Sequence, residues 1–564
     1  MGSAASAVKN RKQSNKDEAL HPELVKIHST VGAHKFPFDT RRGSVVLQEV
    51  QKMREELRKL ENITTYGSGL CCVPPKTRPP LDPGFRPFIL GKQSYMKAVE
   101  RCPDHEIFEF ALIRQNNLCG RCSIPVFPEG NPNIEDSKVY VSTVVKFWLW
   151  QRGGYKLYVC GSDSLCTYLK NAFNATGKFH FDILTMEKIY NNPFQVIIVD
   201  TASDMPAEKE EAEVMNTVAD GCRLAFDLGK SDFKIVAVQD GEVVFSKETE
   251  WDIWKKDPDY HYEIVLEVLK EAASKLPRVD GLGGSTAGTP INNDCVWSDC
   301  FPDIEPDLYK AKVVPIFKRW AEALGDVPLK VINDGEVTAL AGMQMVGKGG
   351  LFGISMGSNE GAGYVDRNGA LKGWINELWA GTVDMNPTAA ICPWSGAVGN
   401  GSMYFGQRAV EKLCTVAGFT FDEDMLPQHK LKIVQKAMKE GDINARLIYE
   451  SIGVYLGYAL AQYAEFYEFD HVLILGRVSS GEGGQVMLDK AKEVIENEFP
   501  ELNLQYHSPD EHMKRVGQCV AAAALPKTTG SVQVTQNGSV QVTQNGAKAD
   551  IQVEEIQEVD VTAH

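Results

Sequence analysis

Residues 224–238 read LAFDLGKSDFKIVAV and decide the fold of this chain. An apolar run ends at Asp227, a turn containing Gly229 and Ser231 follows, and a second apolar run begins at Phe233. This pattern predicts two strands joined by a tight turn whose backbone N–H groups can face an anion. Glycine lets the main chain approach a phosphate closely. Because a carboxylate cannot bind phosphate directly, we expect Asp227 to hold a hydrated Mg²⁺. An ordinary hairpin with Asp and Gly at its turn fits the same residues.

A second Asp-centred turn follows about a hundred residues later, where residues 329–336 read LKVINDGE. An apolar run ends at Asn333-Asp334, and a helical pattern begins there. One interpretation is that Asp334 is the N-cap of that helix. The other is that Asp334 is a general base that takes a proton from a substrate hydroxyl. Phosphoryl transfer needs little from the protein beyond positioning and charge neutralisation, so these two turns favour a kinase.

Two Gly/Ser turns downstream also follow predicted strands. Residues 353–361 read GISMGSNEG, and we expect Gly357, Ser358 and Asn359 to form a second phosphate-binding turn. Residues 471–481 read HVLILGRVSSG, where a buried strand enters a turn at Gly476 that suits approach by an adenosine group.

A third segment is a candidate for substrate binding. Residues 373–381 read GWINELWAG. The carboxylate of Glu377 suits a pair of neighbouring hydroxyls, because its two oxygens accept two hydrogen bonds. A surface glutamate in an aromatic turn fits the same residues.

In this order and at this spacing, the segments resemble the hexokinase and ROK sugar kinases of the actin-like ATPase superfamily, over residues 221–526. Residues 227–235 are similar to the phosphate-1 motif DLGGTNFRV, and residues 353–359 to the phosphate-2 loop GTGTN. Asn333-Asp334 resembles the catalytic ND pair, and Asn376-Glu377 resembles the sugar-binding segment. Leu475-Gly476 resembles the LGG adenosine loop, and residues 281–290, GLGGSTAGTP, resemble the ROK strand and turn GIGVxxPG.

This resemblance implies an α/β fold with two duplicated actin-like ATPase (ribonuclease H-like) lobes around a cleft, and an extra N-terminal α/β domain. It implies ATP-dependent phosphorylation of a hydroxyl on a sugar or sugar-like small molecule, with ATP and Mg²⁺ as cofactors. Asp334 would be the general base, and Asp227 would be the carboxylate that holds the metal. The substrate would be bound by Asn333, Asn376 and Glu377. The nucleotide would be bound by Gly229, Lys230, Ser231, Gly357, Ser358, Asn359 and Gly476.

Changes in composition along the chain predict four parts. Residues 1–88 form a polar arm, with helical apolar spacing at 44–60 and six prolines at 72–87. Residues 89–220 form an additional α/β domain that contains a βαβ unit at 156–199. Residues 221–526 form the kinase-like domain. Residues 527–564 repeat GSVQVTQN twice before an acidic end and are expected to be disordered.

Bulk composition excludes some classes of protein. The 564 residues carry a formal charge of -16, which disfavours a general affinity for nucleic acid. The 13 cysteines are scattered, as in reduced intracellular proteins, and no apolar run is long enough to span a bilayer. We therefore expect a cytoplasmic protein, whose oligomeric state stays open. Residues 1–6, MGSAAS, fit N-myristoylation at Gly2, which with the basic residues that follow would give weak membrane anchoring; an unmodified start also fits.

Alternatives remain open at two places. Cys102, His105, Cys119 and Cys122 have spacings compatible with zinc, although free thiols are the default for scattered cysteines. Lys230 stands where the related kinases have a second glycine, and Arg477 interrupts the adenosine loop. Both residues favour a different class of protein, a nucleotide- or sugar-binding regulator that has weakened or lost catalysis.

Overall fold

The computed structural model describes residues 69–216, 218–230, 232–422, 425–508 and 511–527, and three short strands beyond them. The segment 44–60, Gly2 and Ser231 therefore lie outside the described residues. The chain divides into two compact units. Unit 1 comprises Met1–Ala212, Ile354–Ala362 and Lys372–Tyr506, and unit 2 comprises Glu213–Gly353, Gly363–Leu371 and His507–His564.

The elements of unit 2 alternate between strands and helices. They are β5 (Glu213–Val214), β6 (Cys222–Leu228), β7 (Asp232–Gln239), β8 (Glu242–Glu250), α8 (Pro258–Ala273), β9 (Gly281–Thr286), β10 (Gly288–Ile291), β11 (Asp294–Ser298), α9 (Pro306–Leu308), α10 (Ile316–Ala323), β12 (Leu329–Asn333), α11 (Asp334–Val346), β15 (Ala370–Leu371) and α16 (Glu511–Ala524).

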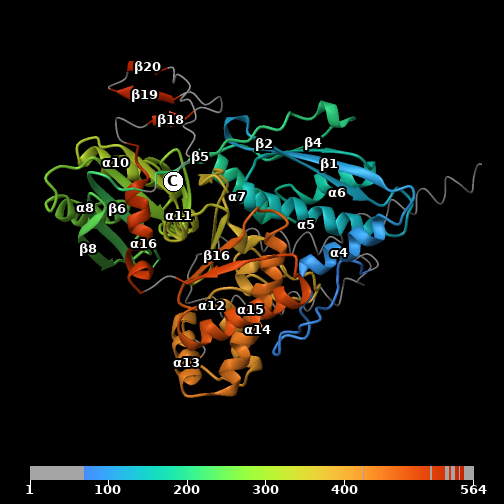
Figure 1. Ribbon diagram of the computed structural model, residues 1–564. Helices are drawn as coiled ribbons and strands as arrows, with labels where there is room; N and C mark the ends of the chain where they lie inside the picture. Colours follow the sequence, from blue (N-terminus) through green and yellow to red (C-terminus); the bar gives the residue numbers. More distant parts are fainter. Residues whose placement is uncertain are drawn as a thin grey trace, which may run out of the picture. The chain divides into compact units, whose positions relative to one another are not determined.

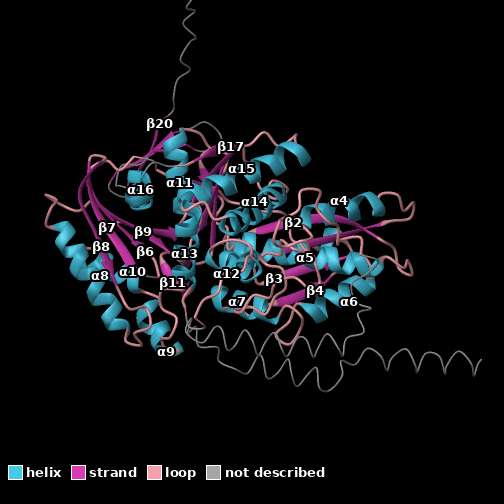
Figure 2. Cartoon of the chain, turned by 90° about the horizontal axis from the view of Figure 1, so that it is seen from below, coloured by secondary structure: helices cyan, strands magenta, loops and turns pink. Residues whose placement is uncertain are grey.

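Five of these strands form one sheet with the order β12-β9-β6-β7-β8. β6, β7 and β8 are antiparallel to one another, whereas β9 and β12 continue the sheet in parallel on the other side of β6. Helices α8 and α10 lie against one face and α16 against the other (Figure 2). The apolar core under α10 is aromatic, with the ring centroid of Phe226 lying 5.5 Å from that of Phe317 and 5.3 Å from that of Trp320.

Two of these regions are interrupted by local features of the chain. β7 and β8 form a hairpin, because Asp240 and Gly241 both adopt the left-handed conformation of a tight turn. Between residues 306 and 323 the chain forms α9, a π-helical turn (Tyr309–Val313) and α10 in succession. Pro315 precedes α10, and proline cannot donate a helical hydrogen bond.

Glycine is required in β9 because neighbouring elements approach the strand from both faces. A Cβ on Gly283 would lie 1.8 Å from the carbonyl oxygen of Ala522 in α16, and a Cβ on Gly284 would lie 2.3 Å from the ring of Phe226. The run GLGG is therefore needed for packing as well as for a turn.

We expect Gly283→Ala to lower the free energy of unfolding by about 3 kcal/mol, because backbone and helix must separate to admit the methyl group. Gly361→Ala is the matched control, since the nearest atom to its Cβ would be the Ser355 Cβ at 3.6 Å. It should change stability by less than about 1 kcal/mol. Urea denaturation of both variants measures the difference, and equal midpoints would contradict the close packing of α16 on β9.

A second sheet, of four strands, repeats the strand order of the first without a counterpart of β8. Its strands are β13 (Leu351–Met356), β14 (Glu360–Val365), β16 (His471–Leu475) and β17 (Gln505–His507), in the order β14-β13-β16-β17. In each sheet the first strand has its hairpin partner on one side and the two later strands on the other. The mixed α/β fold is thus confirmed, and the shared strand order agrees with the predicted duplication.

The N-terminal part of unit 1 contains a third sheet, with the order β2-β1-β3-β4. β3 and β4 are parallel with helices between them, which confirms the predicted βαβ unit and adds a second helix to it. α5 runs along one face of the sheet (Figure 1). The elements are α4 (Phe88–Val99), β1 (Glu106–Ile113), β2 (Cys119–Val126), α5 (Ile134–Arg152), β3 (Lys156–Cys160), α6 (Asp163–Ala172), α7 (His180–Tyr190) and β4 (Gln195–Ile198).

The proline-rich segment at 72–87 is an extended wrap on unit 1. The Asp82 carboxylate accepts hydrogen bonds from Tyr455 (2.6 Å) and Lys412 (3.1 Å), and the backbone N–H of Arg86 donates to Asp384 (2.9 Å). These partners lie on or near the helices that complete unit 1, which are α12 (Gln407–Val416), α13 (Pro427–Lys439), α14 (Ile443–Tyr463) and α15 (Gly481–Glu498).

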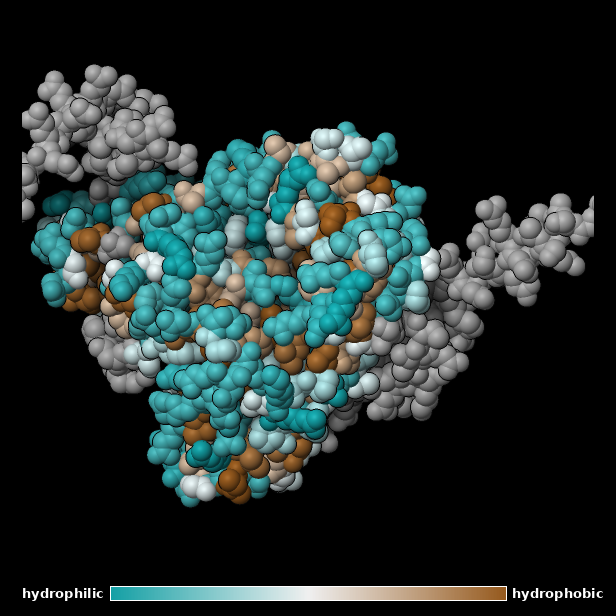
Figure 3. Space-filling view, turned by 45° about the vertical axis from the view of Figure 1, so that its right-hand side comes forward, coloured by the Kyte–Doolittle hydropathy of each residue, from teal (hydrophilic) through white to brown (hydrophobic). Residues whose placement is uncertain are grey.

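Three stretches of the C-terminal segment are paired strands where the sequence predicts disorder: β18 (Val532–Val534), β19 (Val540–Gln544) and β20 (Ala547–Ile551). The valine-rich repeat has the β-propensity that such pairing needs. Of the helices in the described residues, none is long and apolar enough to cross a membrane. The molecular face drawn in Figure 3 is mostly hydrophilic, with hydrophobic residues scattered over it.

Candidate functional site

In unit 2, the candidate residues lie at the carboxyl ends of three neighbouring parallel strands. Asp227 in β6 pairs with Ser285 in β9, and Thr286 in β9 pairs with Asn333 in β12. Carboxyl ends of parallel strands meet at one edge of a sheet, where ligands of α/β proteins bind. The two Asp-centred turns of the sequence therefore share one edge, and Asp334 follows directly after it.

Asn333, and not Asp334, is the N-cap of α11. Its Oδ1 accepts a hydrogen bond from the Gly335 N–H (2.7 Å), and its Nδ2 donates to the Gly288 carbonyl oxygen (2.8 Å). The Asn333 backbone N–H in turn favours the charged form of the Glu336 carboxyl. The alternative in which Asp334 caps the helix is thus wrong, because a cap precedes the first helical residue. The amide of Asn333 orients the turn, and its predicted contact with substrate stays a prediction.

Asp334 begins α11 and is half-buried, so its carboxyl reaches solvent only in part. Burial raises its pKa to about 7, and the charges of Asp227 and Asp299 add to the rise. The Gly335 N–H and Lys230 act in the opposite direction. A carboxyl with a pKa near neutrality is both deprotonated often enough and basic enough to accept a proton at physiological pH.

The first turn contains an ion pair that the sequence did not predict. Lys230 Nζ lies 2.5 Å from Asp299 Oδ2, next to Gly229, whose N–H donates to the Asp232 carbonyl oxygen (3.0 Å). Burial raises the pKa of Asp227, an effect that Lys234 opposes. The lysine side chain is thus directed to Asp299, where it balances part of the negative charge around Asp227 and Asp334.

Three hydroxyl groups at this edge were missed by the sequence analysis. Ser285, Thr286 and Thr289 are at most 5% exposed. The Ser285 hydroxyl acts on the neighbouring Asp227 carboxyl, whose pKa it lowers against the effect of burial, while within the described residues the hydroxyl oxygens of Thr286 and Thr289 have no hydrogen-bond partner. A buried hydroxyl without a partner is costly unless a ligand or water satisfies it. The signal was the run STAGT that follows the strand glycines.

In unit 1, the predicted phosphate and adenosine turns are in contact. A Cβ on Gly476 would lie 2.4 Å from the Met356 carbonyl oxygen, to which the Val478 N–H donates (3.1 Å). Gly357 follows directly and has open space around its Cβ position among the described atoms. The Gln407 N–H at the start of α12 donates to the Gly357 carbonyl oxygen (2.9 Å).

The same loop contains polar groups without partners. The Asn359 Oδ1 is buried and accepts no hydrogen bond from the described residues, while Ser358 beside it is exposed. Glu360 is 3% exposed; its Oε1 accepts from Tyr463 (2.6 Å), and its Oε2 is unpartnered in the described part of the chain. Burial raises the Glu360 pKa to about 8, so it is mostly protonated at pH 7.

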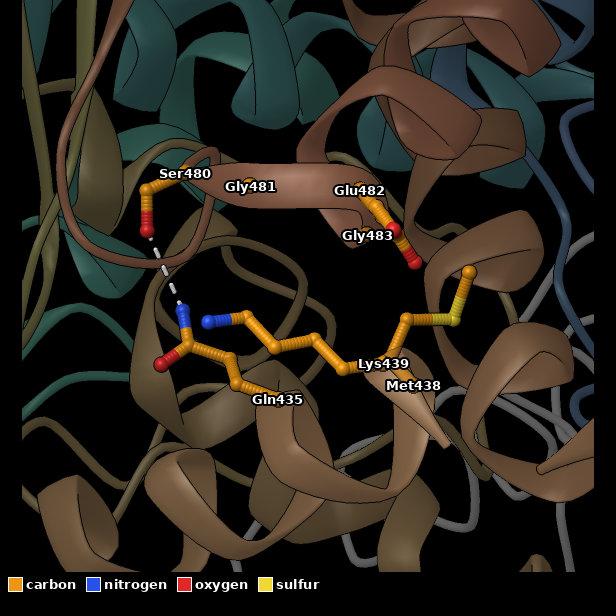
Figure 4. Close-up of a pocket in the computed structure, with 7 residues that line it drawn as sticks. All are labelled: Gln435, Met438, Lys439, Ser480, Gly481, Glu482 and Gly483. Carbon is orange, nitrogen blue, oxygen red and sulfur yellow. Dashed lines mark hydrogen bonds between the residues drawn. The ribbon is translucent and has the colours of Figure 1, made fainter. Parts of the chain in front are cut away.

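A cavity of about 210 Å³ lies between α13 and the start of α15. Gln435 and Lys439 extend from α13 toward the turn at Ser480, and Gln435 Nε2 donates to Ser480 Oγ at 3.1 Å (Figure 4). The complete lining is Gln435, Met438, Lys439, Ser480, Gly481, Glu482 and Gly483. The turn begins at Gly476, so the cavity continues from the predicted adenosine loop.

The residues contributed by α13 were also missed. The helix was not predicted, although Pro427 at its first position and buried apolar residues at Leu431, Val434 and Met438 are helical signals.

The predicted substrate segment is held mainly by other protein groups. Asn376 is 4% exposed, and its Oδ1 accepts a hydrogen bond from Tyr467 (2.9 Å). Glu377 is half-buried, and its Oε2 accepts from the Trp379 indole N–H (2.7 Å). Carboxylate oxygens accept more than one hydrogen bond, so Glu377 retains the capacity to bind a hydroxyl.

The four residues considered for zinc do not converge. His105 directly precedes β1, whereas Cys119 pairs with Ile113 at the far end of that strand. Eight residues of strand separate these positions by about 23 Å, which no single ion can bridge. The described residues contain no group of three or more His, Cys, Asp or Glu side chains that could hold a metal ion.

Comparison with known proteins finds similarity at the level of structure. No protein-family model and no curated protein sequence matches the chain. It is similar in fold to a ROK hexokinase from Thermus thermophilus, with 17% identity, a TM-score of 0.43, and coverage of 54% of this chain and 97% of that one.

Two further solved structures show the same extent of similarity. A ROK-family glucokinase from Streptomyces griseus, solved with glucose and AMPPNP, is 17% identical with a TM-score of 0.41, covering 54% of this chain and 98% of that one. A ROK-family transcriptional regulator, a homolog of the E. coli MLC protein, is 18% identical with a TM-score of 0.44, covering 54% and 77%.

Proposed function

We propose that this protein transfers a phosphoryl group from ATP to a hydroxyl of a sugar or sugar-like small molecule, with Asp334 as the general base. The observation that carries the proposal is the half-buried Asp334 carboxyl, whose pKa is raised to about 7 beside Asp227 at the carboxyl ends of β6, β9 and β12. A base with this pKa accepts a hydroxyl proton most effectively near neutral pH.

The donor set fits ATP and Mg²⁺. ATP would supply the phosphoryl group and Mg²⁺ the charge that balances it. In unit 2, Asp227 would hold the metal through water, and Gly229, Lys230 and Ser231 would bind phosphate. Unit 1 by itself has groups suited to a nucleotide: the open Gly357, Ser358 and the unpartnered Asn359 amide oxygen would bind phosphate, and the cavity between α13 and α15 would bind adenosine.

The substrate would be a polyhydroxylated molecule. The unpartnered hydroxyls of Thr286 and Thr289 supply both donors and acceptors at the strand edge next to Asn333. Glu377 and Asn376 form the second substrate segment. Such a donor and acceptor set suits a ring of hydroxyl groups and leaves its own groups unpaired without one.

The proposal is tested by measuring ADP release from ATP and Mg²⁺ with hexoses, amino sugars and polyols. We expect one class to stimulate ADP release and Asp334→Asn to abolish the stimulation. Measurable ATP binding without stimulation by any of these compounds would instead support a regulator.

The cavity gives a separate prediction for the nucleotide. Lys439→Glu is expected to raise the KM for ATP about fivefold, equivalent to about 1 kcal/mol, because it reverses a charge beside an anionic ligand. The KM for the sugar should not change. Lys436→Glu on the same helix is the control, since Lys436 pairs with Glu440 (3.8 Å) and is not among the lining residues. Equal ATP affinities in the two variants would show that the nucleotide does not bind in this cavity.

The ion pair of Lys230 with Asp299 favours a second candidate, a nucleotide- or sugar-binding regulator with weakened catalysis. A lysine held by Asp299 occupies the turn where the related kinases have glycine. In that case Lys230→Gly would raise activity, whereas in a kinase that uses Lys230 for phosphate it would raise the KM for ATP.

A further inference from the structure

The N-terminal part of unit 1 forms hydrogen bonds to the backbone of the substrate segment, residues 373–377, at both ends of that segment. At one end, Arg114 Nη1 donates to the Gly373 carbonyl oxygen (3.2 Å). At the other end, the N–H groups of Asn376 and Glu377 donate to the Gln151 (3.0 Å) and Trp150 (2.8 Å) carbonyl oxygens. These two carbonyls belong to the last turn of α5, whose final carbonyls lack partners within the helix.

Glu210 contacts side chains on both sides of this set of hydrogen bonds. Its carboxylate pairs with Arg114, accepts a hydrogen bond from Arg152 (3.1 Å), and accepts one from the Trp374 indole N–H (3.3 Å). The Arg152 guanidinium also lies over the Trp374 ring, 4.6 Å from its centroid. One carboxylate therefore links the residue that follows β1, the end of α5 and the substrate segment.

The charge balance of this cluster depends on Glu210. Arg114 is 1% exposed and the Arg152 side chain 16%, so both guanidinium groups are largely removed from water. Two cations this close repel each other unless an anion lies between them. Loss of the Glu210 charge would thus loosen Arg114, and with it the Gly373 end of the segment.

The conformation of the segment needs this support. Asn376 has a φ of 50°, in the left-handed region, which asparagine adopts more readily than other residues apart from glycine but which is still an uncommon backbone conformation. Surrounding contacts must hold a backbone in such a conformation. Glu377 follows it directly, so the direction of its carboxylate depends on this backbone.

We infer that Glu210 is a positioning residue: through Arg114, Arg152 and Trp374 it holds residues 373–377 in the conformation that directs Glu377 toward the substrate. This inference rests on the proposed function, and it assigns a role in substrate affinity to the N-terminal part of unit 1.

The test compares Glu210→Gln with Glu211→Gln in the full-length protein. Glu211 is a neighbouring carboxylate whose side chain is 59% exposed and pairs with Lys209, so its variant is the matched control. Amide hydrogen exchange of the peptide 373–379 measures how firmly the backbone hydrogen bonds of this segment are held. We expect exchange at Asn376 and Glu377 to accelerate at least fivefold in Glu210→Gln and to be unchanged in Glu211→Gln.

Steady-state kinetics measure the effect of Glu210 on the affinity for the sugar. For the sugar that stimulates ADP release most, Glu210→Gln should raise KM at least fivefold while the KM for ATP and kcat change less than twofold. Glu210→Asp, which keeps the charge, should restore most of the sugar affinity. A purely structural role would instead lower kcat and both affinities together.

The outcomes separate the inference from the proposed function. Unchanged exchange at residues 376–377 overturns the inference, whatever the activity. Faster exchange with an unchanged sugar KM also overturns it, because the segment would not control binding. If no sugar stimulates the wild-type protein, the proposed function fails, while the exchange experiment still decides whether Glu210 holds the segment.

Discussion

Replacing Asp334 by asparagine is expected to lower turnover about 10³-fold, since a positioned general base contributes 10² to 10⁴ in rate. Asparagine keeps the shape and the oxygen that accepts the Gly335 N–H (2.9 Å), so ATP affinity should change less than threefold. Asp303→Asn is the control, because Asp303 lies in a surface pair with Lys256 in the same unit. The measurement is single-turnover phosphorylation together with ATP binding, and retained turnover would exclude Asp334 as the base.

The raised pKa of Asp334 adds a pH signature to this variant. In the wild type, kcat/KM should rise about tenfold per pH unit up to about pH 7 and then level off, because only the deprotonated carboxylate accepts a proton. The variant should lose this limb. Asparagine also removes the cost of ionising a half-buried acid, so it should be more stable at pH 8, by on the order of 2 kcal/mol after allowance for exposure.

Glu360→Gln is expected to change the pH dependence of stability more than any other single substitution of a carboxyl outside the proposed site. Burial raises the Glu360 pKa from 4.5 to about 8, so between these values the folded protein keeps a proton that the unfolded chain has lost. Stability therefore falls as pH rises through this window and is constant above it, by on the order of 4 kcal/mol in total. Glutamine does not titrate, so the variant should lose this decrease.

Urea denaturation at intervals from pH 4 to pH 9 measures the effect. Below pH 4.5 the two proteins should have similar stability, and above pH 8 the variant should be clearly more stable. Glu493→Gln is the control, since Glu493 is 46% exposed and pairs with Lys490 on the surface. A stability difference between Glu360→Gln and wild type that does not vary with pH would show that Glu360 is ionised in the folded protein.

Local patterns in the sequence were sufficient where one element and its turn carry the information. Asp227 and Asp334 each follow a short apolar run, and the structure puts both at the carboxyl edge of one sheet because β6, β9 and β12 are parallel. The capping role of Asn333 was also within reach, since NDGE has the spacing of a cap followed by an acid at the third helical position.

Tertiary contacts account for what the sequence did not predict. The ion pair of Lys230 with Asp299 joins residues far apart in the chain, and the hydrogen bond between Glu210 and Trp374 joins residues that are 164 positions apart. Neither has a periodicity or a spacing that a sequence window detects. The unpartnered hydroxyls of Thr286 and Thr289 were visible as residues, but their burial and lack of partners depend on the packed sheet.

The packing of α16 has a consequence for how the protein is made. The sheet of unit 2 begins with β6, yet α16, which covers one of its faces, is synthesised about three hundred residues later. Arg223 in β6, for example, donates a hydrogen bond to the carbonyl oxygen of Pro526, which is 303 positions further along the chain. Until then, the bare glycine surface of β9 has no covering helix while the chain leaves the ribosome. Domains with such distant contacts fold slowly and expose apolar surface in the meantime. A nascent chain that stops before α16 should therefore depend on chaperones, and the sheet of unit 2 is covered only once α16 has been made.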